Sequence, residues 1–168
     1  MNNFDNFLLI ATLSLAATVY AYIVSKDTKF ATFDCRVWFI RYIHYFFCVF
    51  VMLYIFMFDV RYHKLMFVIL TGVLLHWIIF DECILTIVEK KLLYREYVAG
   101  INTDDVFIDV LNMNQSVRML TTVIITLIWC TTVAVTLRHI PQLPIGAKVV
   151  ITIVYSAVII RHNMLRIM

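Results

Sequence analysis

Long apolar segments alternate with short polar ones along the whole chain. A helix needs about 20 mainly apolar residues to cross the hydrocarbon core of a bilayer. By this criterion the predicted spans cover about residues 7–24, 37–58, 65–89, 119–137 and 147–160. The fifth segment is short, so it spans only if its N-terminal flank lies within the interface or if the bilayer thins locally. We therefore predict an all-α integral membrane protein with about five transmembrane helices.

The first apolar segment, residues 7–24, has two interpretations. Small residues near its end would suit a cleaved signal peptide. However, the leader before it contains no Lys or Arg, and the apolar stretch is long for a signal. Both features favour an uncleaved first helix.

Two polar connections determine the expected topology. Residues 59–64 form a short polar turn, so the second and third spans should be antiparallel neighbours. The longest connection, about residues 93–116, contains Thr103 as a helix cap with acidic residues in the first turn. We predict a short amphipathic cytoplasmic helix over about residues 104–112. It either lies on the membrane surface or packs on the ends of the bundle, and both interpretations remain open.

Composition supports a membrane protein and excludes other classes. Hydrophobic residues make up 63% of the chain and charged residues 15%, which is unlike a soluble domain. Five spans leave little room for anything else, so residues 1–168 are treated as a single membrane domain. No basic, aromatic-rich surface typical of nucleic-acid binding is present. The expected partners are the lipid bilayer and either a second copy of the chain or another membrane protein.

The distribution of basic residues predicts the orientation. The side that holds the N-terminus has four, namely Arg61, Lys64, Arg138 and Lys148. The other side has ten, namely Lys26, Lys29, Arg36, Arg41, Lys90, Lys91, Arg95, Arg118, Arg161 and Arg166. Because cytoplasmic segments carry an excess of Lys and Arg, we expect the N-terminus outside and, with five spans, the C-terminus in the cytoplasm.

The cysteines and three of the histidines form no chemical motif. The cysteines are Cys35, Cys48, Cys83 and Cys130. They show neither CxxC nor Cys/His metal spacing, so we expect buried reduced thiols and no metal site. The histidines expected at the membrane interfaces, facing solvent, are His63, His139 and His162.

The third span is unusual because polar residues interrupt it. An acid within a membrane helix costs a few kcal/mol, so such a group usually pairs with another or lines a site. At about 100° per residue, one polar face of this helix is formed by His76, Glu82, Cys83, Thr86 and Glu89. Asp81 points away from that face.

The second span carries a matching polar stripe of Arg41, His44 and Cys48 at i, i+3 and i+4 spacing. In an antiparallel pair, the start of the second span meets the end of the third. His44 and Glu82 would then both lie about 10 Å from the cytoplasmic boundary. We predict a His44–Glu82 contact with Arg41 near Glu89. Such a cluster either holds the helices together or forms a proton-handling or polar-ligand site.

Depth argues against a haem held by His44 and His76. By the same count His76 lies nearly 20 Å deep, about 9 Å from the level of His44. The axial ligands of a bis-histidine haem must face each other at one level. We therefore predict no cofactor, and the identity of any bound group is left unassigned.

Residues 83–89 (CILTIVE) resemble the Cys-Pro-Leu-Thr-x-x-Glu signature of a family of small, mainly bacterial membrane proteins, catalogued as domain of unknown function 2784. Residues 107–109 (FID) are similar to a Phe-Ile-Glu segment of that family. His44 stands where the family tends to have a histidine. The resemblance covers about residues 41–160. It implies a four-helix core, with the first helix as an addition, and no known activity.

The chain also departs from the pattern of this family. Ile84 stands in place of the signature proline, and Lys90-Lys91 replaces an Asn-Arg pair that often follows the glutamate. The resemblance nevertheless favours Cys83, Thr86 and Glu89 acting as a unit.

Three functional hypotheses follow. The leading one is a non-enzymatic protein whose polar cluster organises the bundle and binds a partner or a small polar ligand. Its members are Arg41, His44, His76, Glu82, Cys83, Thr86 and Glu89. The alternatives are a membrane redox or other cofactor-dependent enzyme that uses His44, Glu82 and Cys83, and a proton or ion pathway. Catalytic residues are not assigned.

Overall fold

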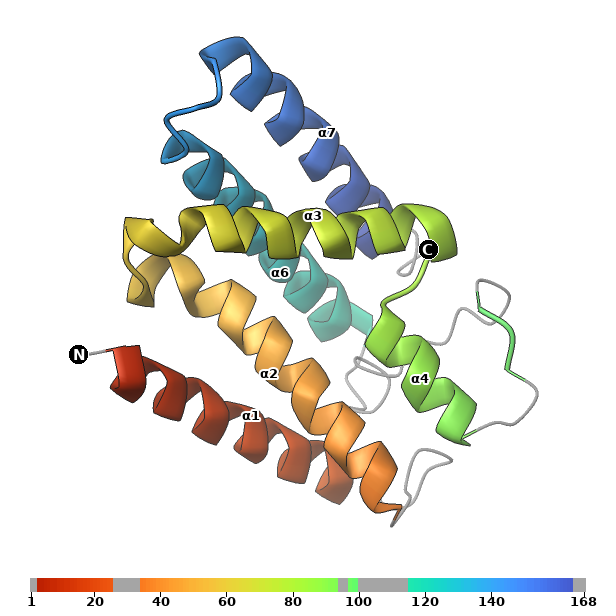
Figure 1. Ribbon diagram of the computed structural model, residues 1–168. Helices are drawn as coiled ribbons and strands as arrows, with labels where there is room; N and C mark the ends of the chain where they lie inside the picture. Colours follow the sequence, from red (N-terminus) through yellow and green to blue (C-terminus); the bar gives the residue numbers. More distant parts are fainter. Residues whose placement is uncertain (1–2, 26–33, 94–96, 100–114, 165–168) are drawn as a thin grey trace.

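The computed structural model describes residues 3–25, 34–93, 97–99 and 115–164, and these residues are helical apart from short turns (Figure 1). Within this described part, five segments are long and apolar enough to cross a membrane. They contain α1 (Asn3–Ser25), α2 (Cys35–Met57), α3 (His63–Phe80) with the preceding 3₁₀ turn η1 (Val60–Tyr62), α6 (Gln115–Arg138) and α7 (Ile145–Met164). A further short helix is α4 (Ile84–Leu93). The all-helical, multi-pass prediction is confirmed. The predicted surface helix at 104–112 lies outside the described residues.

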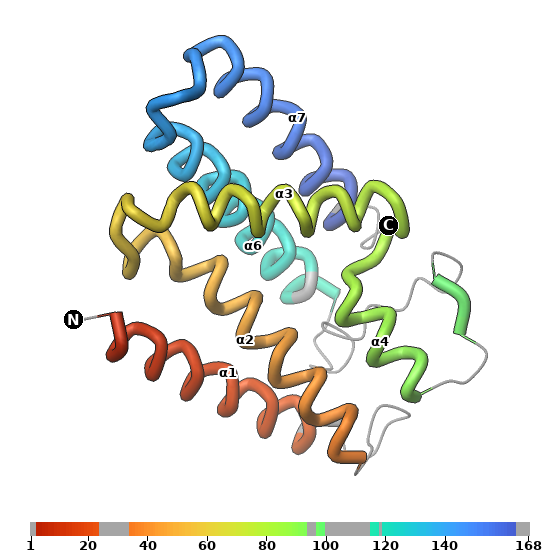
Figure 2. Tube along the Cα trace, in the orientation of Figure 1, coloured from red at the N-terminus to blue at the C-terminus, as the bar shows by residue number. Residues whose placement is uncertain are grey.

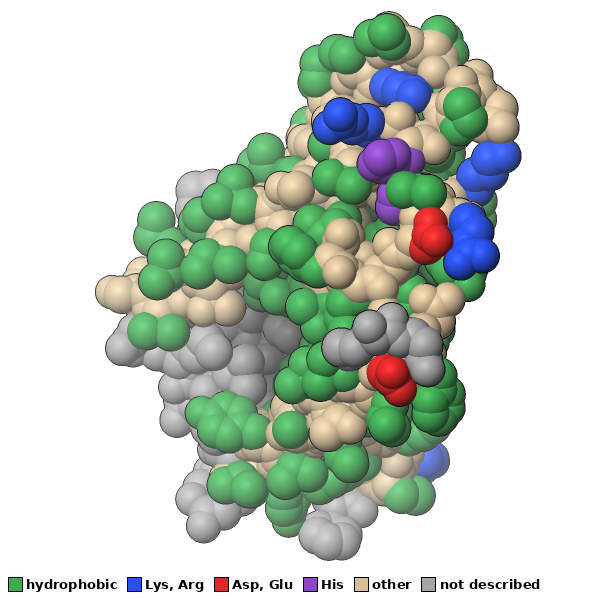
Figure 3. Space-filling model, turned by 90° about the vertical axis from the view of Figure 1, so that its left-hand side faces the viewer, with side chains coloured by type: hydrophobic (Ala, Val, Ile, Leu, Met, Phe, Trp, Pro, Cys, Tyr) green, Lys and Arg blue, Asp and Glu red, His purple; other side chains and the backbone are tan. Residues whose placement is uncertain are grey.

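Four of the long helices lie side by side in the order α1, α2, α6, α7 (Figures 1 and 2). Helix α3 crosses this layer and packs on α6 and α7, whereas α4 packs on α2. Large apolar side chains remain exposed on the outer helix faces, as lipid contact requires. Figure 3 shows hydrophobic side chains spread over much of one face of the molecule.

The core lies between α2, α3 and α6. Its fully buried side chains include Tyr54, Leu70, Leu74 and Val133. His63 also belongs to this interior: its Nδ1 lies 2.8 Å from the Tyr54 hydroxyl, and its ring lies 4.9 Å from that of His139. The prediction that His63 faces solvent is therefore wrong, because the 59–62 turn folds the start of α3 back onto α2. His139 is exposed, as expected.

The helix starts reflect local chemistry. Asp34 caps α2, and its carboxylate accepts a hydrogen bond from the Arg36 backbone N–H at 2.8 Å. Side-chain hydrogen bonds from Arg36 hold the pKa of the Asp34 carboxyl below its usual range. Helix α7 begins directly after Pro144, whose carbonyl accepts from the Lys148 N–H at 3.1 Å. Helix α7 has 20 residues and extends beyond the predicted 147–160 segment at both ends.

The third predicted span differs most from expectation. The sequence predicted one helix over residues 65–89, but α3 ends at Phe80 and α4 begins at Ile84. Asp81 between them has φ 53°, the left-handed conformation, and its N–H donates to the Trp77 carbonyl at 2.9 Å. Aspartate adopts this conformation more readily than most non-glycine residues, so it ends α3 in place of the usual glycine.

Two side-chain contacts secure this break. His76 Nδ1 lies 2.9 Å from the backbone carbonyl oxygen of Glu82, a group that no longer continues the helix. The Asp81 carboxylate, meanwhile, accepts from Arg161 of α7 at 3.2 Å in an exposed ion pair. His76 therefore holds the turn together and does not belong to a cluster with Glu89.

Candidate functional site

Helix α4 turns polar side chains toward the interior of the protein. Thr86, Glu89 and Lys90 are buried on the same helix, each at most 2% exposed. Arg41 of α2 meets Glu89 with Nε 2.5 Å from Oε1, and both side chains are almost fully enclosed. The structure thus brings together Arg41 and Glu89, the pair that the sequence placed near each other.

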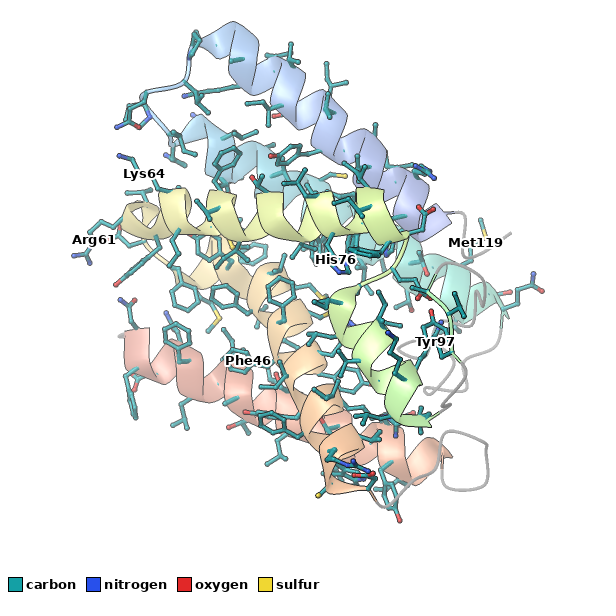
Figure 4. All side chains as sticks on the ribbon, turned by 45° about the vertical axis from the view of Figure 1, so that its right-hand side comes forward. Phe46, Arg61, Lys64, His76, Tyr97 and Met119 are labelled. Atoms are coloured by element: carbon teal, nitrogen blue, oxygen red, sulfur yellow. The ribbon has the colours of Figure 1, made fainter. Side chains whose placement is uncertain are left out.

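Glu82 lies in the turn before α4, and its carboxylate is shared by two partners. Lys90 Nζ lies 2.8 Å from Glu82 Oε1, and the Tyr97 hydroxyl donates to Glu82 Oε2. The Lys90 ammonium also lies over the Tyr97 ring, 5.0 Å from its centroid, in a cation–π contact. Glu82 therefore pairs with Lys90 and Tyr97 instead of His44, because the break at Asp81 changes the direction in which it projects. Figure 4 shows Tyr97 beside α4.

The two ion pairs balance four buried charges. Removing a charge from water costs several kcal/mol, and a close partner of opposite sign offsets that cost. Lys90 and Tyr97 were missed as site residues from the sequence, where Lys90 was only counted among the basic residues of the cytoplasmic side. The available signal was the presence of three acids, Asp81, Glu82 and Glu89, in the apolar run, with a lysine directly after the last of them.

A cavity of about 90 Å³ lies among α2, α3, α4, α6 and α7. The polar or sulfur-containing side chains around it come from α2, α4, α6, α7 and the turn before α4: His44, Cys48, Met52, Cys83, Thr86, Thr122, His162 and Asn163. Three of the predicted site residues, His44, Cys83 and Thr86, are therefore brought to one place. No Asp, Glu, Lys or Arg of the described chain lines this cavity.

Aromatic rings form one wall of the cavity. The Trp77 indole stacks on the His162 imidazole with centroids 3.9 Å apart and planes 9° apart, and Trp129 lies 5.1 Å from Trp77. Trp77 is 7% exposed, and its buried Nε1–H has no acceptor among the described residues. His162 is half-buried in this stack, so the prediction that it only faces solvent is wrong. The stack depends on the position of α7, which no local sequence signal reveals.

The cysteines are all free thiols, but none is fully buried. Cys35 is exposed at the start of α2, and the other three are partly exposed. The expectation of buried thiols is therefore wrong. Among the described residues, no group of three or more His, Cys, Asp or Glu side chains is arranged to hold a metal ion.

Comparison with protein-family models, curated proteins and solved structures finds no match for this chain.

The Arg41–Glu89 pair gives a direct test of the energetics. Glu89→Gln leaves the buried Arg41 without its carboxylate, so we expect the free energy of unfolding to fall by about 3–5 kcal/mol. The double variant Arg41→Met/Glu89→Leu should lose less than Glu89→Gln, because it leaves no unpaired buried charge. Reversible unfolding in mixed detergent micelles measures both changes.

The exposed Arg161–Asp81 pair supplies the matched control. Arg161→Gln should change the free energy of unfolding by no more than about 1 kcal/mol. The double variant Arg41→Met/Glu89→Leu is also compared with Arg41→Met and Glu89→Leu alone. If its loss in free energy of unfolding equals the sum of the losses of these two single variants, Arg41 and Glu89 do not interact as described.

Proposed function

We propose that this multi-pass membrane protein binds a small, uncharged polar ligand in the cavity among α2, α3, α4, α6 and α7. The carrying observation is the lining of that cavity, where the uncharged polar side chains of Thr86, Thr122 and Asn163 meet aromatic walls. Small-molecule sites typically combine a mainly apolar, aromatic lining with a few polar groups that orient the ligand. The absence of charged side chains from the described lining favours an uncharged ligand.

The ion pairs have a structural role in this proposal. Arg41–Glu89 holds α4 against α2, and Lys90–Glu82 ties α4 to the turn before it. Helix α4 supplies Thr86 to the cavity. Each carboxylate is already engaged by a cation, which supports a role in scaffolding over one in proton handling. The cluster predicted from sequence thus divides into two parts. The supporting part consists of Arg41, Glu82 and Glu89, and the ligand-facing part consists of His44, Cys83 and Thr86.

The proposed relationship to the family with the Cys-x-Leu-Thr-x-x-Glu signature fits this division. Cys83 and Thr86 line the cavity, and Glu89 holds the supporting ion pair. The three signature positions would then couple the ligand site to the scaffold, which gives a physical reason for their common spacing.

A saturable response of tryptophan emission to imidazole tests the binding function. Imidazole is a small polar ring that is uncharged well above pH 7, and Trp77 and Trp129 report from the cavity wall. Wild-type protein in nanodiscs should respond with saturation. Thr122→Phe should abolish the response, because it fills the cavity from α6.

Thr131→Phe is the matched control, since Thr131 lies exposed on the same helix and does not line the cavity. It should respond like the wild type. An absent response, or an equal response from all three proteins, would show that the cavity does not bind polar ligands.

The proposed orientation places the N-terminus outside and the C-terminus in the cytoplasm. Arg41 and Lys90 are neutralised in buried ion pairs, and discounting these two leaves eight of the ten basic residues on the cytoplasmic side against four on the other. The excess therefore persists and still favours this orientation.

Reporter fusions check the orientation. A fluorescent protein fused after Met168 should fluoresce, and alkaline phosphatase at the same position should be inactive, because phosphatase folds only outside the cytoplasm. A phosphatase inserted at Gln142, in the turn between α6 and α7, should be active. Activity at the C-terminus and none at Gln142 would reverse the assignment.

A further inference from the structure

A groove lies between α6 and α7, and the described residues that line it are different from those that line the cavity. The groove has a volume of about 450 Å³ and is open at the surface of the protein. Most of its lining is aliphatic, with Leu137 from α6 and Ile145, Val149 and Ile153 from α7. The three residues of α7 are exposed, and both helices are candidate membrane spans. The α6–α7 groove therefore opens to lipid.

Two basic side chains stand at one end of the α6–α7 groove. Arg138 is the last residue of α6, and Lys148 lies in the first turn of α7. The Lys148 ammonium donates to the Arg138 backbone carbonyl at 3.1 Å, which holds it at the end of α6 that carries the guanidinium. No Asp or Glu of the described chain lines the groove. Figure 3 shows Lys and Arg side chains gathered in the upper part of the molecule, where Figure 1 places the α6–α7 turn.

The rest of the groove runs from this basic end toward the middle of the membrane. Helices α6 and α7 are antiparallel neighbours joined by a short turn, so residues of both helices lie deeper with distance from that turn. At about 1.5 Å per residue, Ile153 lies about 8 Å deeper than Lys148, and Ala134 lies about 6 Å deeper than Arg138. Thr152 also lines the groove, but its hydroxyl donates to the Lys148 carbonyl within α7. The groove is thus basic at the membrane surface and apolar below it.

Charge complementarity selects the class of ligand. Arg and Lys are the side chains that bind phosphate groups, and the Lys148 ammonium has three N–H donors, of which the bond to α6 uses one. An acyl chain suits the aliphatic part of the lining, which faces hydrocarbon. A free phosphate would use only the basic end, and a neutral lipid only the aliphatic part. Basic pockets between transmembrane helices bind anionic lipid head groups in the same way.

We propose that the α6–α7 groove binds an anionic phospholipid, with the phosphate against Arg138 and Lys148 and an acyl chain along Val149 and Ile153. This lipid site is independent of the ligand proposed for the cavity. In the proposed orientation the α6–α7 turn lies outside, so the lipid would come from the outer leaflet.

Native mass spectrometry of the full-length protein in detergent micelles tests this site. Titration with dioleoylphosphatidylglycerol should show saturable binding. Dioleoylphosphatidylcholine has the same acyl chains but no net charge, so it should bind about tenfold more weakly. In Arg138→Gln/Lys148→Gln, the dissociation constant of dioleoylphosphatidylglycerol should rise about thirtyfold, because both cations at the phosphate are lost.

Arg61→Gln/Lys64→Gln is the matched control. It removes the same two charges from exposed residues that do not line the groove and that are expected on the same side of the membrane. The dissociation constant should stay at the wild-type value.

Two single variants carry the test if Arg138→Gln/Lys148→Gln fails to fold. Arg138→Gln keeps the bond from Lys148 to α6 and should raise the dissociation constant about fivefold. Val149→Trp fills the groove from an exposed position without a change in charge, and it should also weaken binding.

Inorganic phosphate distinguishes a lipid site from a simple anion site. In excess it should not displace dioleoylphosphatidylglycerol, because it makes no contact with the aliphatic lining. Equal binding of the two lipids, an unchanged dissociation constant in the groove variants, an equal rise in the Arg61/Lys64 control, or displacement by phosphate overturns the proposal.

Discussion

Pairing of buried charge determines where α4 lies, and the cavity depends on α4. Arg41 with Glu89 and Lys90 with Glu82 place four charges in an interior that water does not reach. Each charge alone would be driven to the surface by the cost of desolvation, so neither side of a pair is stable there without the other. Helix α4 has only 10 residues, too few to be stable in isolation, and tertiary contacts must hold it. Thr86 then reaches the cavity as a consequence.

The spans could be predicted from sequence because hydropathy over about 20 residues reports directly on the bilayer. The stripe of Arg41, His44 and Cys48 was also accessible, since helical spacing alone puts these residues on one face. The break of the third helix at Asp81 could not be predicted from the sequence. It depends on one non-glycine residue in the left-handed conformation, with no proline or glycine to mark it. The predicted His44–Glu82 contact, which assumed a continuous third helix, failed for this reason, whereas the predicted proximity of Arg41 and Glu89 holds despite the break.

Contacts between distant helices account for the other differences. Tyr97 reaches Glu82 from just beyond the end of α4, and His162 stacks on Trp77 because α7 packs on α3. Sequence periodicity describes one helix at a time and carries no information about contacts between different segments. The resulting site combines a charged support with an uncharged, aromatic-walled cavity. This arrangement gives the scaffolding and ligand-binding hypotheses one physical basis, since the ion pairs position the wall that a ligand would contact.

Hydrogen exchange at the backbone amides of α4 tests the central claim most directly. In the wild-type protein, the amides of Ile84–Leu93 should be protected, because buried ion pairs hold the helix in place. In Glu89→Gln they should lose protection, while the amides of α6 keep theirs. Rapid exchange of α4 in the wild type, or unchanged protection in the variant, would contradict the account.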